Sequence, residues 1–227
     1  MQEELEQVKA QLHQTQSQLE QSQSQLHQIQ GQLEELQTQY QQIQGELQQA
    51  IELNPNLFSS YHALGDTLFK LEKWEEAAAA YGRASELNPD FFWSSYSLGE
   101  ALLKLQQWEE AVTSYRHVIE LMPDFPWSYY HLGNTLIKLE KWEDAFDIYS
   151  QGISIAPNLP WPYRNLGDAL LKLGQLEEAI SCYRRAVEFN PDVAEIYYDL
   201  AETLAKLGQV EEAISCYRRA VELTSSN

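Results

Sequence analysis

The chain has 227 residues, 44% of them hydrophobic, and a formal net charge of -19. This hydrophobic content excludes a fully disordered chain and suffices for one or two domains with a core. A surface this acidic repels phosphate backbones and anionic lipids. We therefore expect neutral or basic protein segments as partners, rather than acidic segments, nucleic acid or membranes.

Residues 1–53 are predicted to form a coiled-coil helix. The segment contains nineteen glutamines, no proline and one basic residue, Lys9. Apolar residues recur in alternating steps of three and four over seven heptads, from Leu5 to Ala50, and we call this stripe the heptad seam. Because a lone helix would leave the seam in water, we expect homo-oligomers, with the number of strands left open. The contact is expected at Leu5, Leu12, Leu19, Leu26, Ile29, Leu33 and Leu36, whereas Thr15 and Ser22 weaken the seam.

Residues 54–227 are predicted to form five helix pairs. The sequence repeats every 34 residues without insertion or deletion, and a proline recurs near the end of each of the first four copies. Five pairs of fixed length indicate an all-α solenoid, in which each pair buries its apolar face on its neighbours. The copies are 58–91, 92–125, 126–159, 160–193 and 194–227.

The recurring residues resemble those of the tetratricopeptide repeat. Each copy has Leu-Gly at its seventh and eighth positions, except that the last copy has Ala201 in place of glycine. A small residue and an aromatic residue follow, four apart, in the second helix: Ala77 and Tyr81, Ala111 and Tyr115, Ala145 and Tyr149, Ala179 and Tyr183, Ala213 and Tyr217. The resemblance implies a right-handed solenoid of helix pairs whose concave groove binds peptides. The leader and the motif DFPW (124–127) also resemble the arms of bacterial repeat-bearing transferases.

The 34-residue period extends backwards into the coiled-coil segment. It places Ile43 at the recurring alanine, Leu47 at the aromatic position, Ala50 at the next small position and Pro55 at the proline. We therefore expect the end of the coiled-coil helix to be the second helix of a half repeat, which caps the solenoid without a flexible linker.

One face of each first helix is the candidate binding surface. Since an α-helix turns about 100° per residue, the second, fifth, ninth and thirteenth positions lie opposite the core stripe. In the resembled family this face lines the peptide-binding groove. The predicted groove residues are Trp93, Trp127 and Trp161; Tyr96, Tyr130, Arg164 and Tyr198; Asp66, Glu100, Asn134, Asp168 and Glu202; and Lys104, Lys138 and Lys172.

Two features of this face have open interpretations. The acids at the ninth position stand four residues before a lysine, so they either form solvated pairs or stripe a groove for a zwitterionic peptide. The tryptophans at the second position either pack on the preceding loop or form a binding ledge, and their absence from the first and last copies favours binding. Trp74, Trp108 and Trp142, which start the second helices, are expected in the core.

Motifs of an active site are missing from the sequence. It has no glycine-rich phosphate loop, zinc-ligand spacing or nucleophile motif, so we expect no enzyme, cofactor or metal. His131 is expected to face away from the core. Cys182 and Cys216 recur 34 residues apart and are expected to be small buried residues in a reducing compartment. Without a transmembrane run or a signal peptide at the start, we expect a cytoplasmic protein.

These patterns together predict a non-enzymatic interaction scaffold. The coiled coil would multimerise the chain, and the solenoid would hold a segment of a partner protein or peptide. Two alternatives stay open: the targeting arm of a larger enzyme such as a glycosyltransferase, and a self-assembling structural spacer.

Overall fold

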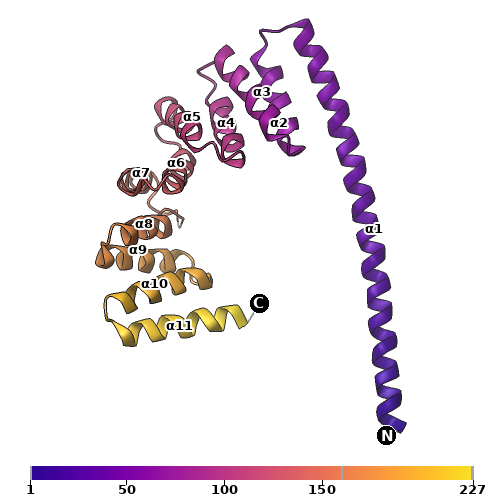
Figure 1. Ribbon diagram of the computed structural model, residues 1–227, viewed down its shortest axis with the longest axis vertical. Helices are drawn as coiled ribbons and strands as arrows, with labels where there is room; N and C mark the ends of the chain where they lie inside the picture. Colours follow the sequence, from indigo (N-terminus) through magenta and orange to yellow (C-terminus); the bar gives the residue numbers. More distant parts are fainter. Residues whose placement is uncertain (1, 160, 226–227) are drawn as a thin grey trace.

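A computed structural model of the chain describes the backbone of residues 2–159 and 161–225 and the side chains of residues 13–159 and 162–225. Within these ranges one long helix precedes five helix pairs that stack into an arc, and no strand occurs (Figure 1). The predicted all-α solenoid with a long N-terminal helix is confirmed. The helices are α1 (Gln2–Leu53), α2 (Phe58–Lys70), α3 (Trp74–Leu87), α4 (Phe92–Lys104), α5 (Trp108–Leu121), α6 (Pro126–Lys138), α7 (Trp142–Ile155), α8 (Trp161–Lys172), α9 (Leu176–Phe189), α10 (Ala194–Lys206) and α11 (Val210–Ser225).

Each helix pair is closed by the same short turn. The second turn residue has a left-handed conformation in every repeat, with φ near 59° at Glu72 and Gln106 and 56° at Glu140. The fourth and fifth repeats place glycine there, Gly174 and Gly208, and glycine adopts this conformation without a steric penalty. The recurring turn brings the two helices of a pair together as an antiparallel hairpin.

The core of each of the first four pairs is a tyrosine ring packed against a glycine. Tyr115, Tyr149 and Tyr183 are fully buried, and so are the alanines one turn before them. A Cβ added at Gly133 would lie 2.5 Å from the ring of Tyr149, well inside van der Waals contact. The Leu-Gly pair of the first helix therefore admits the aromatic residue of the second helix, and this explains why both recur with the period.

The end of α1 packs on the first repeat in the register of a second helix. Ile51 is buried, and Leu47 packs on the cluster formed by Leu64, Leu68 and Tyr81. The ammonium of Lys70 lies 5.5 Å from the ring centroid of Tyr40. Tyr40 precedes Trp74 by one period, and the ammonium of Lys104 lies 5.6 Å from the ring of Trp74. The contact between Tyr40 and Lys70 is therefore equivalent to a contact between the first two helix pairs.

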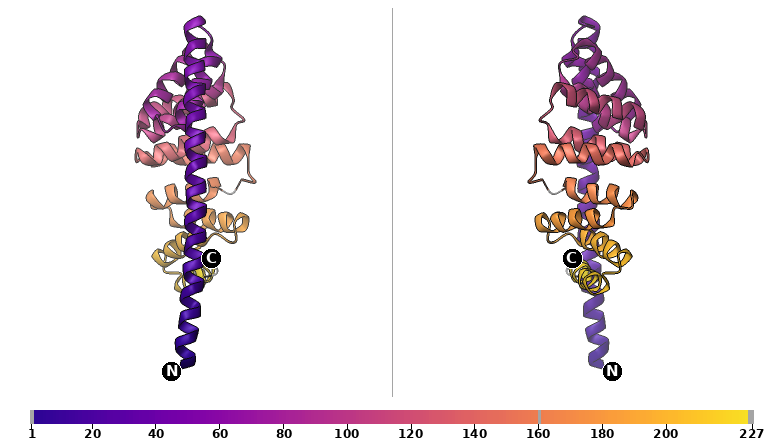
Figure 2. Two further views of the ribbon diagram at one scale, coloured as in Figure 1. Left: turned by 90° about the vertical axis from the view of Figure 1, so that its right-hand side faces the viewer. Right: turned by 90° about the vertical axis from the view of Figure 1, so that its left-hand side faces the viewer.

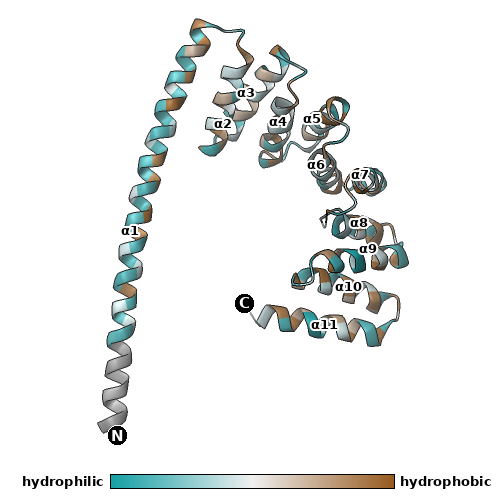
Figure 3. Cartoon of the chain, turned by 180° about the vertical axis from the view of Figure 1, so that it is seen from behind, coloured by the Kyte–Doolittle hydropathy of each residue, from teal (hydrophilic) through white to brown (hydrophobic). Residues whose placement is uncertain are grey.

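The rest of α1 stands apart from the solenoid. Helix α1 lies on the open side of the arc (Figure 1), and it runs along the length of the stack (Figure 2). Hydrophobic residues recur along this otherwise hydrophilic helix (Figure 3). The seam residues Leu19, Leu26, Ile29, Leu33 and Leu36 are 45–59% exposed, so nothing in the described chain covers them. Leu5 and Leu12, also predicted at this contact, lie outside the residues whose side chains are described.

Gly133→Ala is expected to destabilise the solenoid by about 1–3 kcal/mol, because the added methyl group overpacks the Tyr149 ring. Gly82→Ala is the matched control. Gly82 lies inside α3, and a Cβ added there would have no neighbouring atom within 4 Å, so alanine should stabilise that helix by about 0.5–1 kcal/mol. Urea unfolding of both variants measures the difference. Equal stability of the two variants would refute the packing role of the glycine.

Candidate functional site

The candidate site is the inner face of the arc, formed by α2, α4, α6, α8 and α10 (Figure 1). Two exposed tryptophans lie at the helix starts on this face. Trp93 is 42% exposed and Trp127 is 44% exposed. The side chain of Trp161, predicted in the same row, lies outside the described residues.

The two tryptophans are supported by neighbouring rings. Trp93 contacts Phe125 at 5.6 Å between centroids and Tyr96 at 5.7 Å. Trp127 contacts Tyr130 edge to face at 6.0 Å. Each tryptophan therefore has a packed side and a side open to solvent, a combination compatible with both structural support and binding.

His131 connects this aromatic group to the core. Its ring stacks on Tyr115 at 5.4 Å and meets Tyr96 and Tyr130 edge to face at 5.4 and 5.0 Å. Burial lowers the pKa of His131 to about 4, so its imidazole is neutral near pH 7. The expectation that His131 faces away from the core was therefore wrong, because α6 packs on the preceding repeat and places this ring on Tyr115.

In the first, third and fourth repeats the residue at the ninth position accepts a hydrogen bond from the core tyrosine of the same repeat. The hydroxyl of Tyr81 donates to Asp66 at 2.8 Å, that of Tyr149 to Asn134 at 2.6 Å, and that of Tyr183 to Asp168 at 2.6 Å. Burial raises the pKa of Asp168, although the Tyr183 hydroxyl opposes the shift. The polar row on the inner face is thus tied to the centre of each pair.

Glu100 departs from this pattern. Its side chain is one methylene longer, and the hydroxyl of the fully buried Tyr115 has no hydrogen-bond partner among the described residues. The Glu100 carboxylate lies instead 3.9 Å from Nε2 of His131, and burial raises its pKa. A hollow of about 350 Å³ opens here, lined by Phe69, Glu100, Leu103, Lys104, Trp108, His131, Asn134 and Lys138.

The lysines at the thirteenth position contact aromatic rings more than acids. Among the described residues, the expected pair with the acid four residues earlier forms between Glu202 and Lys206, at 2.7 Å. Lys104 and Lys172 instead lie over the rings of Trp74 and Trp142, at 5.6 and 5.8 Å from the centroids. Such contacts hold each lysine against the preceding repeat.

Trp74, Trp108 and Trp142 lie at the opposite edge of the inner face. All three are half-buried, so the expectation that they belong to the core was wrong. Trp74 packs on Phe69 at 4.7 Å, and Trp108 lines the hollow beside Glu100. The groove therefore has aromatic side chains at both edges.

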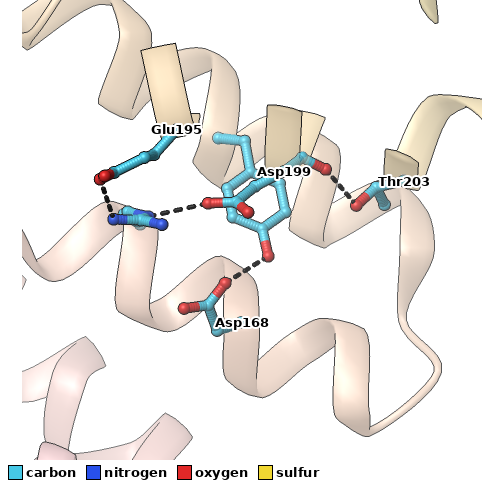
Figure 4. Close-up of polar contacts among 6 residues, drawn as sticks. Asp168, Glu195, Asp199 and Thr203 are labelled. Carbon is cyan, nitrogen blue, oxygen red and sulfur yellow. Dashed lines mark hydrogen bonds and ion pairs between the residues drawn. The ribbon is translucent and has the colours of Figure 1, made fainter. Parts of the chain in front are cut away.

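The last two repeats give the groove a different chemistry (Figure 4). Arg164 donates from Nε to Asp199 at 2.8 Å and from Nη1 to Glu195 at 3.2 Å. Asp168 lies beside this cluster, and Arg164 lowers its pKa while Asp199 raises it. Two carboxylates thus pair with one guanidinium and a third lies nearby, so this end of the groove is acidic.

Sequence reasoning missed the sixth position of the repeats. His131, Asn165 and Asp199 occupy it, and each reaches back to the preceding repeat: to Glu100, to Asn134 at 2.8 Å, and to Arg164. The polar character of this row was visible in the sequence. Its contacts depend on how one repeat is rotated on the next, and helix periodicity within one repeat does not give that rotation.

Hollows on the outer face have another origin. One of about 370 Å³ includes Arg116, Leu132 and Ile148, and another of about 320 Å³ includes Gln48, Leu64 and Ala80. These sets are 68 residues apart in the sequence, two full periods, so both belong to a furrow that recurs between successive second helices. Because this furrow is the same from repeat to repeat, it is a weaker candidate for a specific binding site than the inner face.

The described residues contain neither a membrane span nor a metal cluster. No described helix is both long and apolar enough to cross a lipid bilayer. No group of three or more histidine, cysteine, aspartate or glutamate side chains is placed to hold a metal ion in the part of the chain that the structure describes.

Comparisons with known sequences and structures identify the repeat. A family model described as TPR repeat matches residues 65–106, 100–139, 133–174 and 167–208. Two models described as tetratricopeptide repeat match residues 194–227 and 46–79, and the latter includes the end of α1. No curated protein matches significantly.

Solved structures share the fold. MamA residues 41 to the end, from Desulfovibrio magneticus RS-1, match with a TM-score of 0.71 and 22% identity over 75% of this chain and 96% of that one. YrrB, described as a TPR protein with an unusual peptide-binding site, matches with a TM-score of 0.68 and 24% identity, over 78% and 91% of the two chains. At these identities the likeness concerns the arrangement of helices. These matches add no support to the resemblance to transferase arms.

Tyr149→Phe is expected to lower stability by about 0.5–1.5 kcal/mol, because it removes the bond to Asn134. Tyr115→Phe is the matched control and should leave stability unchanged or raise it, since the Tyr115 hydroxyl is buried and has no partner among the described residues. The urea midpoints of the two variants decide between these outcomes. A loss at Tyr115 as large as that at Tyr149 would show that its hydroxyl is bonded in solution.

Proposed function

The chain belongs to the tetratricopeptide repeat family, and we propose that it is a non-enzymatic scaffold that binds a protein or peptide segment in the concave groove and multimerises through α1. The observation that carries this proposal is the pair of exposed tryptophans, Trp93 and Trp127, on the inner face. Tryptophan and tyrosine are enriched among the residues that dominate binding energies at protein interfaces.

The groove also supplies polar groups for recognition. Beside the aromatic side chains of α4 and α6, the hollow near Trp108 contains the partly buried carboxylate of Glu100 and the neutral imidazole of His131. A mostly apolar concave surface with a few fixed polar groups is the usual form of a binding site. YrrB, which shares the fold, has a peptide-binding site, and this likeness supports testing the same role here.

Charge favours a neutral or basic partner. The net charge is -19, and at one end of the groove Arg164 pairs with Glu195 and Asp199, with Asp168 nearby. A lysine or arginine of the partner would relieve the repulsion among these carboxylates. We therefore expect the bound segment to place apolar or aromatic residues at α4 and α6 and a basic residue near α8 and α10.

The cysteines fit a reducing compartment such as the cytoplasm. Both thiols are free and half-buried, and burial raises the pKa of Cys182 to about 11 and also raises that of Cys216. Thiols in such an environment are poor nucleophiles, so we assign them a packing role.

Replacing Trp93 and Trp127 together by alanine is expected to abolish peptide capture. The test probe is a random peptide display library, selected first on the unchanged chain and then rebound to the variant. Because both side chains are more than 40% exposed, stability should fall by less than the roughly 3–5 kcal/mol that a fully buried tryptophan contributes.

The matched control is a double alanine variant of Arg116 and Gln151, which line the furrow on the outer face. This variant should bind the selected peptides as the unchanged chain does. Loss of binding in both variants, or retention of binding without the tryptophans, would rule out the groove as the binding surface.

Deleting residues 1–38 is expected to turn an oligomer into a monomer. The deletion removes most of the exposed seam but keeps Tyr40, Leu47 and Ile51, which pack on the first repeat. Light scattering at micromolar concentration measures the mass of both chains. A monomeric full-length chain, or an unchanged oligomer after the deletion, would contradict multimerisation through α1.

A further inference from the structure

The end of α1 exposes a face that the second helices of the first four repeats bury. Ala77, Tyr81 and Ala84 of α3 are buried against α2, the first helix of the same repeat. The equivalent residues of α1, one period earlier, are Ile43, Leu47 and Ala50. Ile43 is 42% exposed, and Leu47 and Ala50 are half-buried. The half repeat thus has its second helix but lacks a first helix on this face.

The first repeat covers a neighbouring side of α1 and leaves this face open. The residues that meet the first repeat are Tyr40, Gln44, Leu47 and Ile51, in steps of four, three and four. Ile43 and Ala50 are turned away from them by part of a helix turn. They continue the heptad seam, whose residues from Leu19 to Leu36 are about half exposed. The uncovered face of the half repeat and the seam are therefore one continuous surface.

We propose that α1 of a second copy of this chain lies antiparallel along the seam and takes the place of the missing first helix. The inference rests on the proposed multimerisation and specifies its geometry. In every repeat the helix that packs on this face runs antiparallel to the second helix, because a short turn joins the two (Figure 1). A second α1 that follows the same geometry covers Ile43 and Ala50.

The side chains of the half repeat can accept a helix that belongs to another chain. In the first four repeats the buried tyrosine leaves room only for glycine in the first helix, since a Cβ at Gly65 would lie 2.5 Å from the Tyr81 ring. The half repeat has the smaller Leu47 at the tyrosine position. An incoming helix therefore needs no glycine there.

The polar seam positions also favour the antiparallel arrangement. In a parallel pair in register each residue meets its own copy, so the neighbouring d positions Thr15 and Ser22 would form two layers without a large apolar side chain. The antiparallel register that covers the whole seam places Ser22 opposite Leu33 and Thr15 opposite Tyr40. It also pairs Leu26 with Ile29, so each polar residue faces a large side chain.

Disulfide formation tests the orientation in the full-length chain. Cys182 and Cys216 are first replaced by alanine, so that each chain carries a single, introduced thiol. Ser22→Cys and Leu33→Cys chains, one bearing a mass tag, are mixed and oxidised. In the antiparallel pair the two positions face each other and a mixed dimer forms, whereas two copies of position 22 lie eleven residues apart, about 16 Å along the helix, beyond disulfide reach. Ser24→Cys, at the outward f position, is the matched control and should form no dimer.

Light scattering of the same chains under reducing conditions separates the two proposals. An oligomer that yields the mixed dimer and little Ser22→Cys homodimer is the expected result. An oligomer that yields the Ser22→Cys homodimer, or no disulfide, overturns the antiparallel geometry and leaves multimerisation intact. A monomer of the cysteine-free, full-length chain overturns both.

Discussion

The packing of a tyrosine ring against a glycine organises this protein. Tyr81, Tyr115, Tyr149 and Tyr183 each lie against the glycine of their own first helix, at separations that leave no room for a Cβ. This contact sets how closely the two helices of a pair approach. Because the four pairs use the same contact, they have the same shape and stack into a regular arc.

The same tyrosines connect the core to the binding face. Their hydroxyls reach the ninth position, so Asp66, Asn134 and Asp168 are held by the centre of the pair. A groove residue fixed in this way loses little conformational freedom when a partner binds. Glu100 lacks this bond and lies beside His131 instead, so the second repeat departs from the pattern where the hollow opens.

Helix α1 carries two patterns on overlapping residues. Tyr40 and Leu47 occupy heptad positions, and they also occupy repeat positions that pack on the first repeat. Both patterns have helical periodicity, so one helix satisfies them without a break. The orientation of the seam is therefore coupled to the orientation of the solenoid, and a flexible linker would remove this coupling.

The sequence by itself determined the helix pairs, their period, the glycine and tyrosine that join them and the continuity of α1 with the first repeat. These features depend on spacing within one or two helices, where periodicity and steric fit are decisive. Only the tertiary structure showed that His131, Asn165 and Asp199 contact the preceding repeat. It also showed that Lys104 and Lys172 lie over tryptophan rings. The half-buried state of Trp74, Trp108 and Trp142 was likewise visible only there. Such contacts depend on the rotation between successive pairs. That rotation results from the packing of many side chains at once, and no single spacing in the sequence encodes it.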